Sequence, residues 1–172
     1  MTGRRGVWLM VCAVLVSLYL ALGCSGPAAD GRFVGYAPSL ETFPPVGEVI
    51  GSHCGSLDCH GQKGRNLRVY SGNGLRIDEV SGGATTPDEY SSTYDSLISI
   101  DPEVLSAVVQ EGGQKPERWI VISKGRGREA HKGEVAMEAN GEADRCVVSW
   151  LAALIDEAAC TAAAEVLPPE AP

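Results

Sequence analysis

The residues best suited to do chemistry lie in one short segment, residues 53–61, which reads HCGSLDCHG. Cys54 and Cys59 are separated by four residues, and His60 directly follows the second cysteine. A cysteine pair with a histidine next to the second cysteine is the attachment pattern of c-type haem, usually in the form C-x-x-C-H. In that chemistry the two thiols add to the vinyl groups of the porphyrin, and the histidine binds the iron. We therefore expect a covalent haem c, held by Cys54 and Cys59, with His60 as its proximal ligand.

The spacer between the two cysteines is four residues rather than two. The longer C-x4-C-H form occurs among multihaem cytochromes, and the histidine keeps its required place beside the second cysteine. Iron held by His60 has a sixth position, for which His131 and Met137 are the candidates. Both precede the last predicted helix, where class I cytochromes carry their distal methionine. Methionine raises the reduction potential relative to histidine. The sequence leaves open which of the two binds the iron, or whether each faces solvent instead.

The cysteines also admit two interpretations without haem. Four of the six cysteines lie beyond residue 24, and in an exported protein an even number first suggests two disulfides, with three connectivities. These four are Cys54, Cys59, Cys146 and Cys160. A zinc ion held by Cys54, Cys59 and His60 is a third option, although thiolate zinc sites are less usual in oxidising compartments. Haem c, disulfides alone and zinc remain open at this point.

One disulfide can be tested against helix geometry. Cys146 and Cys160 are fourteen positions apart, which corresponds to about 21 Å along an uninterrupted helix. A disulfide requires Cα atoms within about 7 Å of each other. The two cysteines can therefore pair only if the helix ends near Leu154 and the chain turns back. If the helix continued to Ala158, at least one of them would have to pair with a motif cysteine, and haem attachment would fail.

The beginning of the chain has the form of a lipoprotein signal peptide. Two arginines precede an apolar run over residues 7–22, and Gly23 lies directly before Cys24. This order resembles the lipobox of bacterial lipoproteins, in which the cysteine is diacylated and becomes the new N-terminus. We expect an extracytoplasmic protein anchored to a bacterial membrane through lipid on Cys24. Ser25 follows the cysteine and favours the outer membrane. A plain secretory signal cleaved nearby is the alternative.

The chain is acidic, with a formal charge of −8. The predicted signal peptide contains two of the 14 basic residues and none of the 22 acidic ones, so the mature chain would carry −10. An acidic surface disfavours binding to nucleic acid. The sequence also lacks a nucleophile elbow, a phosphate-binding glycine loop before a helix, and an HExxH motif. We expect a protein that is not an enzyme and whose redox partner protein the sequence does not identify.

The elements that must position these residues are predicted to be helices joined by long loops, so the predicted fold class is mostly α. Three segments are predicted to be helical, and they cover residues 46–53, 86–100 and 142–154; in the last two, apolar residues recur at helical spacing. A short apolar stretch over residues 104–109 is expected to add one or two further turns. The clearest start signal is Thr86 followed by Pro87 and then Glu89, a capping box with proline at the first helical position. Residues 61–83 are expected to form a glycine-rich loop, and residues 119–122 a short strand or extended run.

Composition divides the chain into four parts. The segment after the predicted signal is rich in Gly, Ala and Pro, which is typical of a flexible tether. A small, loop-rich domain follows, and such domains usually need a disulfide, a metal or a prosthetic group for stability. The expected parts are the signal peptide (1–23), the tether (24–45), the domain (46–160) and a disordered tail (161–172).

Several short segments together resemble a family of cytochrome c-like lipoproteins from myxobacteria and planctomycetes. The matching segments are residues 54–61, 64–68, 85–90, 116–117, 123–124, 131–133 and 146–151. The resemblance implies a small helical cytochrome c-like domain that carries electrons through one covalently bound haem. The alternative is a disulfide-stapled lipoprotein without haem that acts as a binding or structural module.

The predicted anchor can be tested directly. Cys24→Ser should abolish incorporation of labelled palmitate, because the lipid is attached to this sulfur. The wild-type protein should fractionate with membranes. Palmitate incorporation by the variant, or a soluble wild-type protein, would show that the lipoprotein interpretation is wrong.

Overall fold

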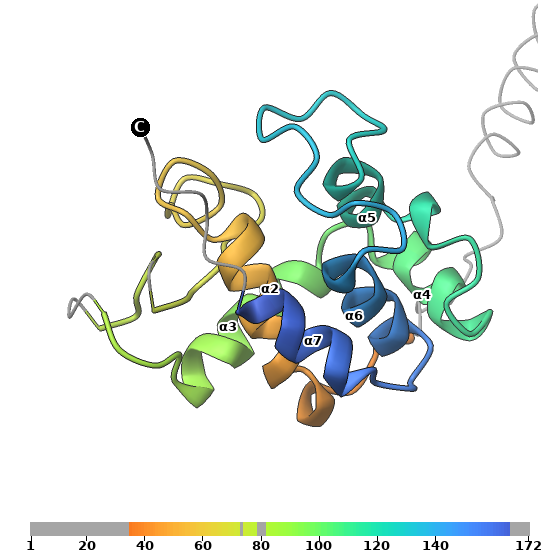
Figure 1. Ribbon diagram of the computed structural model, residues 1–172, viewed down its shortest axis with the longest axis horizontal. Coiled ribbons are helices and arrows are strands. Elements are labelled where there is room, and N and C mark those ends of the chain that lie inside the picture. Colours follow the sequence, from red (N-terminus) through yellow and green to blue (C-terminus); the bar gives the residue numbers. More distant parts are fainter. Residues whose placement is uncertain (1–34, 73, 79–81, 166–172) are drawn as a thin grey trace, which may run out of the picture. The chain divides into compact units, whose positions relative to one another are not determined.

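The computed structural model describes residues 35–72, 74–78 and 82–165. The predicted signal peptide, Cys24 and most of the predicted tail lie outside these residues. The described part consists of helices and loops. An isolated β-bridge joins Tyr70 and Leu75 in this part of the chain. The prediction of a mostly α fold with long loops is confirmed (Figure 1). No helix in the described ranges is long and apolar enough to cross a membrane.

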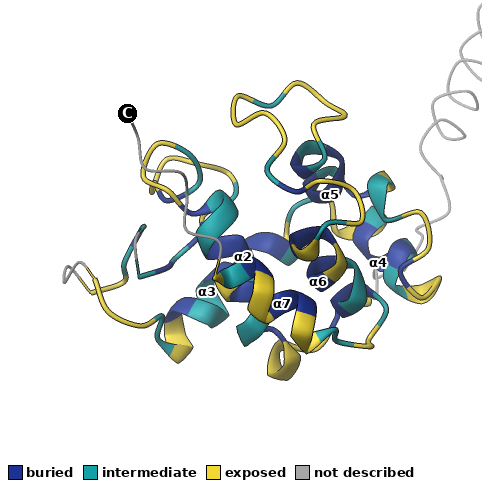
Figure 2. Cartoon of the chain, viewed as in Figure 1, coloured by how far each residue is buried: buried dark blue, intermediate teal, exposed yellow. Residues whose placement is uncertain are grey.

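Two short 3-10 helices and six α-helices follow one another in the described chain. They are η1 (Leu40–Thr42), α2 (Pro44–Cys54), α3 (Pro87–Ile98), α4 (Pro102–Gln110), η2 (Pro116–Arg118), α5 (Ile120–Gly125), α6 (Glu142–Leu151) and α7 (Glu157–Ala164). Figure 1 shows α2, α6 and α7 close together, and α7 packs against both of the others. Buried residues line the inner faces of these helices, whereas exposed residues predominate on the loop between α5 and α6 (Figure 2).

The start of α3 follows the predicted capping box. The Thr86 side chain accepts a hydrogen bond from the Glu89 backbone N–H, and the Glu89 carboxylate accepts one from the Thr86 N–H at 2.9 Å. Glu89 is almost fully buried and pairs with Arg76 at 2.8 Å. Burial alone would raise the pKa of Glu89. The backbone donors of Thr86 and Ile77 and the Arg76 guanidinium outweigh it, so the net direction is downward.

An aromatic cluster attaches the segment before α2 to the helices. The fully buried Phe43 ring lies 5.5 Å from that of Tyr94 and 5.3 Å from that of Trp150, measured between ring centroids. Tyr94 donates a hydrogen bond to the Pro38 carbonyl at 2.8 Å, and Trp150 donates one to that of Ser39 at 3.2 Å. Folded structure therefore begins before residue 46, inside the predicted tether. Pro44 and Pro45, which lie within the predicted tether, form the first turn of α2.

Residues 119–122 do not form the predicted strand or extended run, because α5 begins at Ile120. The β-branched residues of this segment favour a strand by propensity. Trp119 instead occupies the N-cap position of α5. Its side chain is fully buried, and its indole N–H donates a hydrogen bond to the Ile100 carbonyl at 2.8 Å. Val121 and Ile122, in the first turn of α5, are also buried. Packing around the indole thus outweighs the local preference.

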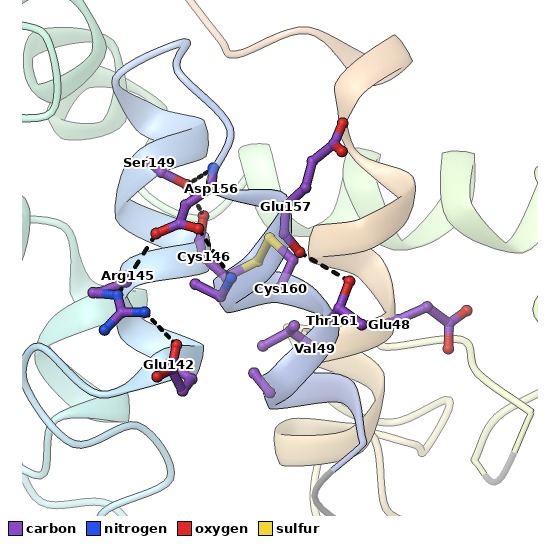
Figure 3. Close-up of a disulfide and its surroundings, with 12 residues drawn as sticks. Glu48, Val49, Glu142, Arg145, Cys146, Ser149, Asp156, Glu157, Cys160 and Thr161 are labelled. Carbon is purple, nitrogen blue, oxygen red and sulfur yellow. Dashed lines mark hydrogen bonds and ion pairs between the residues drawn. A yellow bond between two sulfur atoms is a disulfide. The ribbon is translucent and has the colours of Figure 1, made fainter.

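The last two helices form a hairpin closed by a disulfide. α6 ends at Leu151, and the chain turns through Ala153, whose φ is 56°. Cys146 and Cys160 then face each other with Cα atoms 4.7 Å apart and form a disulfide (Figure 3). The condition derived from helix geometry is therefore met. The second helix of the hairpin, α7, was not predicted and extends the folded part to Ala164.

Two side chains shape the turn of this hairpin. The Asp156 backbone N–H donates to the Ser149 hydroxyl at 2.9 Å, and the Asp156 carboxylate accepts from the Ala159 N–H at 2.9 Å. Asp156 is therefore the N-cap of α7 (Figure 3). The inner face of α7 carries small residues, with Ala159 and Ala163 both buried. Small side chains let α7 lie close to its neighbours.

Replacing Cys146 and Cys160 together by serine should lower the free energy of unfolding by about 3 kcal/mol, because a loop of this length no longer restricts the unfolded chain. Urea unfolding monitored by circular dichroism measures the change. Reducing agent should lower the stability of the wild type by a similar amount and leave the double variant unchanged. Equal stability of the two proteins under oxidising conditions would contradict the prediction.

Candidate functional site

The cysteine motif lies at the C-terminal end of α2. Cys54 is the last residue of this helix, and the Gly55 N–H closes it by donating to the Gly51 carbonyl at 3.0 Å. The chain then makes a turn in which the Cys59 N–H donates to the Ser56 carbonyl at 3.0 Å. The His60 N–H returns to the Cys54 carbonyl, also at 3.0 Å. The four-residue spacer is thus a backbone-bonded turn that brings the second cysteine and the histidine back to the helix end.

Two glycines let the backbone close around the Gly55 carbonyl. A Cβ on Gly61 would lie 2.2 Å from the Gly55 carbonyl oxygen, and a Cβ on Gly74 would lie 2.1 Å from the same atom. Real Cβ atoms do not approach an oxygen this closely, so both positions require glycine. The Gly55 carbonyl is therefore enclosed by backbone from the motif itself and from the loop around residue 74.

The His60 ring is oriented by a backbone carbonyl. Its Nδ1 lies 3.1 Å from the Leu67 carbonyl oxygen, which can only accept, so Nδ1 carries the proton and Nε2 keeps a free lone pair. Burial lowers the pKa of His60, against a rise caused by the Leu67 hydrogen bond. The nearby groups His131, Arg65 and Lys124 lower it as well. A neutral imidazole with Nε2 available is the form that binds a metal.

Cys54 and Cys59 have no disulfide partner in the described part of the chain. Burial, with a smaller contribution from the neighbouring Cys59, raises the pKa of the Cys54 thiol to about 12. A thiol that stays protonated is a poor nucleophile for disulfide exchange. Cys54 therefore lacks the thiolate character of a reactive cysteine, and both Cys54 and Cys59 are present as free thiols.

A cavity of about 560 Å³ opens beside the motif. This volume is typical of a site for a small molecule or cofactor, roughly 300–1,000 Å³. Cys54 and His60 line one side, and side chains from three other parts of the fold contribute an apolar wall. The apolar wall consists of Leu67, Ile100, Ile120 and Val121. A second cavity of about 290 Å³ includes Cys59 and shares His60, Arg65 and His131 with the first.

The structure separates the two candidates for the sixth ligand position. His131 lines both cavities, and its ring centroid lies 6.1 Å from that of His60 with the ring planes 13° apart. Met137 is almost fully buried and packs against Gly125, where an added Cβ would lie 2.3 Å from the methionine Cε. Gly125 itself lines the larger cavity, and Met137 does not. Among the described residues, Cys54, Cys59, His60 and His131 are thus brought together, and Met137 lies behind the wall.

Two basic residues border the cavities and were not identified from the sequence. The Arg65 guanidinium donates to the carbonyls of Cys59 at 2.9 Å and Asp58 at 3.2 Å. Lys124 donates to the Ala130 carbonyl at 3.2 Å. The acidic composition of the whole chain gave no indication of a locally basic site. The positions of Arg65 and Lys124 in the sequence gave no indication of this site either, because the two residues lie on different segments of the chain.

His53 serves the fold and does not face the cavity. Its Nδ1 lies 3.0 Å from the Ala136 carbonyl oxygen, and its Nε2 lies 3.2 Å from that of Ala163. The ring therefore bridges the end of α2, the loop before α6, and α7. Residues 35–72, 74–78 and 82–165 contain no group of three His, Cys, Asp or Glu side chains arranged to hold a metal ion.

Comparison with known proteins adds no family: no family model, curated protein or solved structure matches the chain.

The turn can be tested with two glycine substitutions. Gly61→Ala should destabilise the protein by about 1–3 kcal/mol, because the added methyl group collides with backbone atoms that cannot move aside. Gly64→Ala is the matched control, since nothing lies within 4 Å of its added Cβ. Thermal unfolding of both variants measures the difference. If both substitutions have the same small effect, the close approach around Gly55 is wrong.

Proposed function

We propose that the chain binds a covalent haem c through Cys54 and Cys59, with His60 as an axial ligand, and acts as an electron carrier. The observation that carries this proposal is the arrangement around the larger cavity. The free thiol of Cys54 and the His60 imidazole, with its free Nε2, border an apolar space of cofactor size, and the free thiol of Cys59 lines the smaller cavity that shares His60 with it. Bound haem supplies one-electron oxidation and reduction of its iron.

The residues of the chain provide attachment, orientation and exclusion of water. The Leu67 carbonyl fixes the tautomer of His60, so Nε2 is the nitrogen left free to bind a metal. Leu67, Ile120 and Val121 keep the wall apolar, which limits access of solvent to a bound group. Arg65 and Lys124 place positive charge at the cavity, where it suits the acidic substituents of a porphyrin.

The carrier role is proposed together with a membrane anchor at Cys24. A lipid on this residue would hold the domain at a bacterial membrane, with the outer membrane favoured by Ser25. The protein would then exchange electrons with a partner protein outside the cytoplasm and carry out no catalysis of its own. The resemblance to cytochrome c-like lipoproteins supports the same assignment.

The second candidate function is a binding or structural module without haem. The Cys146–Cys160 disulfide favours such a module, because it links the fold covalently without any cofactor. Under this alternative Cys54 and Cys59 would join each other, and His60 would be dispensable. The two candidates therefore make opposite predictions for the same three residues.

The test is co-expression of the full chain with a haem-attachment system, followed by denaturing gels stained for haem. The wild-type band should stain, and staining should fall at least several-fold in Cys59→Ser. Leu57→Ala is the matched control, because this exposed residue lies within the same turn and touches neither cavity. A colourless wild type whose mass shows four cysteines in two disulfides would rule out the haem assignment.

A further inference from the structure

We infer that His131 is the second axial ligand of this site, opposite His60, and that Met137 is a residue of the core. The inference rests on the proposed function, because it assigns a further ligand to the same haem. It makes the site a bis-histidine site, in which both axial nitrogens come from the chain.

The spacing of the two rings is the first argument. Their centroids are 6.1 Å apart with planes 13° apart. Two imidazoles that bind one metal ion from opposite sides, each with its nitrogen about 2 Å from the metal, have ring centroids roughly 6 Å apart. The same separation also occurs for offset aromatic pairs. Distance alone therefore allows both arrangements, and the hydrogen bonds of the rings distinguish them.

Both rings use Nδ1 for a backbone carbonyl. His60 Nδ1 lies 3.1 Å from the Leu67 oxygen, and His131 Nδ1 lies 3.3 Å from the Glu134 oxygen. Each carbonyl selects the tautomer that leaves Nε2 without a proton. A histidine that binds a metal through one nitrogen and a backbone carbonyl through the other is the usual pattern at metal sites. A simple stacking pair has no need for the same tautomer on both rings.

The loop that carries His131 is attached to α5 on both sides of the ring. Before it, the Lys124 ammonium donates to the Ala130 carbonyl at 3.2 Å. After it, the backbone N–H groups of Ala136 and Met137 both donate to the Gly125 carbonyl at 2.9 Å. A tight turn joins these points, with the Glu134 N–H donating to the His131 carbonyl at 3.1 Å. These hydrogen bonds hold the backbone on both sides of His131 to α5.

Met137, in the same loop, is poorly placed to be the second iron ligand. Its backbone N–H is bonded to Gly125, and its side chain fills the space next to the Cα of that glycine. Moving the sulfur into the cavity would empty a fully packed position in the core. Two histidines give a lower reduction potential than a histidine and a methionine. A bis-histidine carrier would therefore exchange electrons with partners of lower reduction potential than the partners of a methionine-ligated cytochrome.

Absorption and electron paramagnetic resonance spectra of the full chain, co-expressed with a haem-attachment system, test the inference. The oxidised wild type should be low-spin and lack a sulfur-to-iron charge-transfer band. His131→Ala should still stain for covalent haem but lose most of its low-spin signal, and added imidazole should restore it. His131→Met should gain the sulfur-to-iron band. Met137→Leu is the volume-conserving control and should leave the spectrum unchanged.

The outcomes separate the two proposals. Stained His131→Ala protein with an unchanged low-spin spectrum would overturn the ligand assignment and leave the haem assignment intact. A sulfur-to-iron band in the wild type that disappears in Met137→Leu would transfer the role to methionine. A wild type that does not stain for haem would overturn the proposed function and this inference together.

Discussion

The close approach of backbone around Gly55 is the constraint on which the candidate site depends. Its carbonyl oxygen is enclosed by Gly61 and Gly74, neither of which has room for a Cβ. This contact folds the cysteine motif back onto the end of α2, so both thiols and the His60 ring keep a fixed position relative to one helix. Residues from distant segments can then form the opposite wall of the cavity, facing the cysteine motif.

The sequence predicted the fold well where the signal was local. The capping box at Thr86 and Glu89 identified the start of α3, because the two side chains act within one turn. The prediction failed for residues 119–122, where the buried indole of Trp119 outweighs strand propensity. It also missed α7, whose alanine-rich segment has little hydrophobic periodicity. That helix depends on packing against α2 and α6 and on the disulfide, which are long-range contacts.

The candidate site divides in the same way. The motif of Cys54, Cys59 and His60 could be recognised from the sequence because its residues are close along the chain, and its binding of haem stays a prediction. The sequence could not separate His131 from Met137, since only the fold places His131 at the cavities and Met137 against Gly125. The local positive charge of Arg65 and Lys124 was hidden as well. A formal charge of −8 describes the whole chain and not the part of the surface where a ligand or partner would meet it.

The two carbonyl contacts of His53 bear on the proposed electron transfer. This ring links the helix that ends in the cysteine motif to the loop that carries His131, and also to α7, which a disulfide joins to α6. The groups on either side of the cavity therefore belong to one cross-braced frame. If the proposed haem is bound, a frame of this kind would limit the movement of its ligands when the charge on the iron changes. Little nuclear rearrangement would then accompany each electron transfer, and the proposed carrier would have a small reorganisation energy.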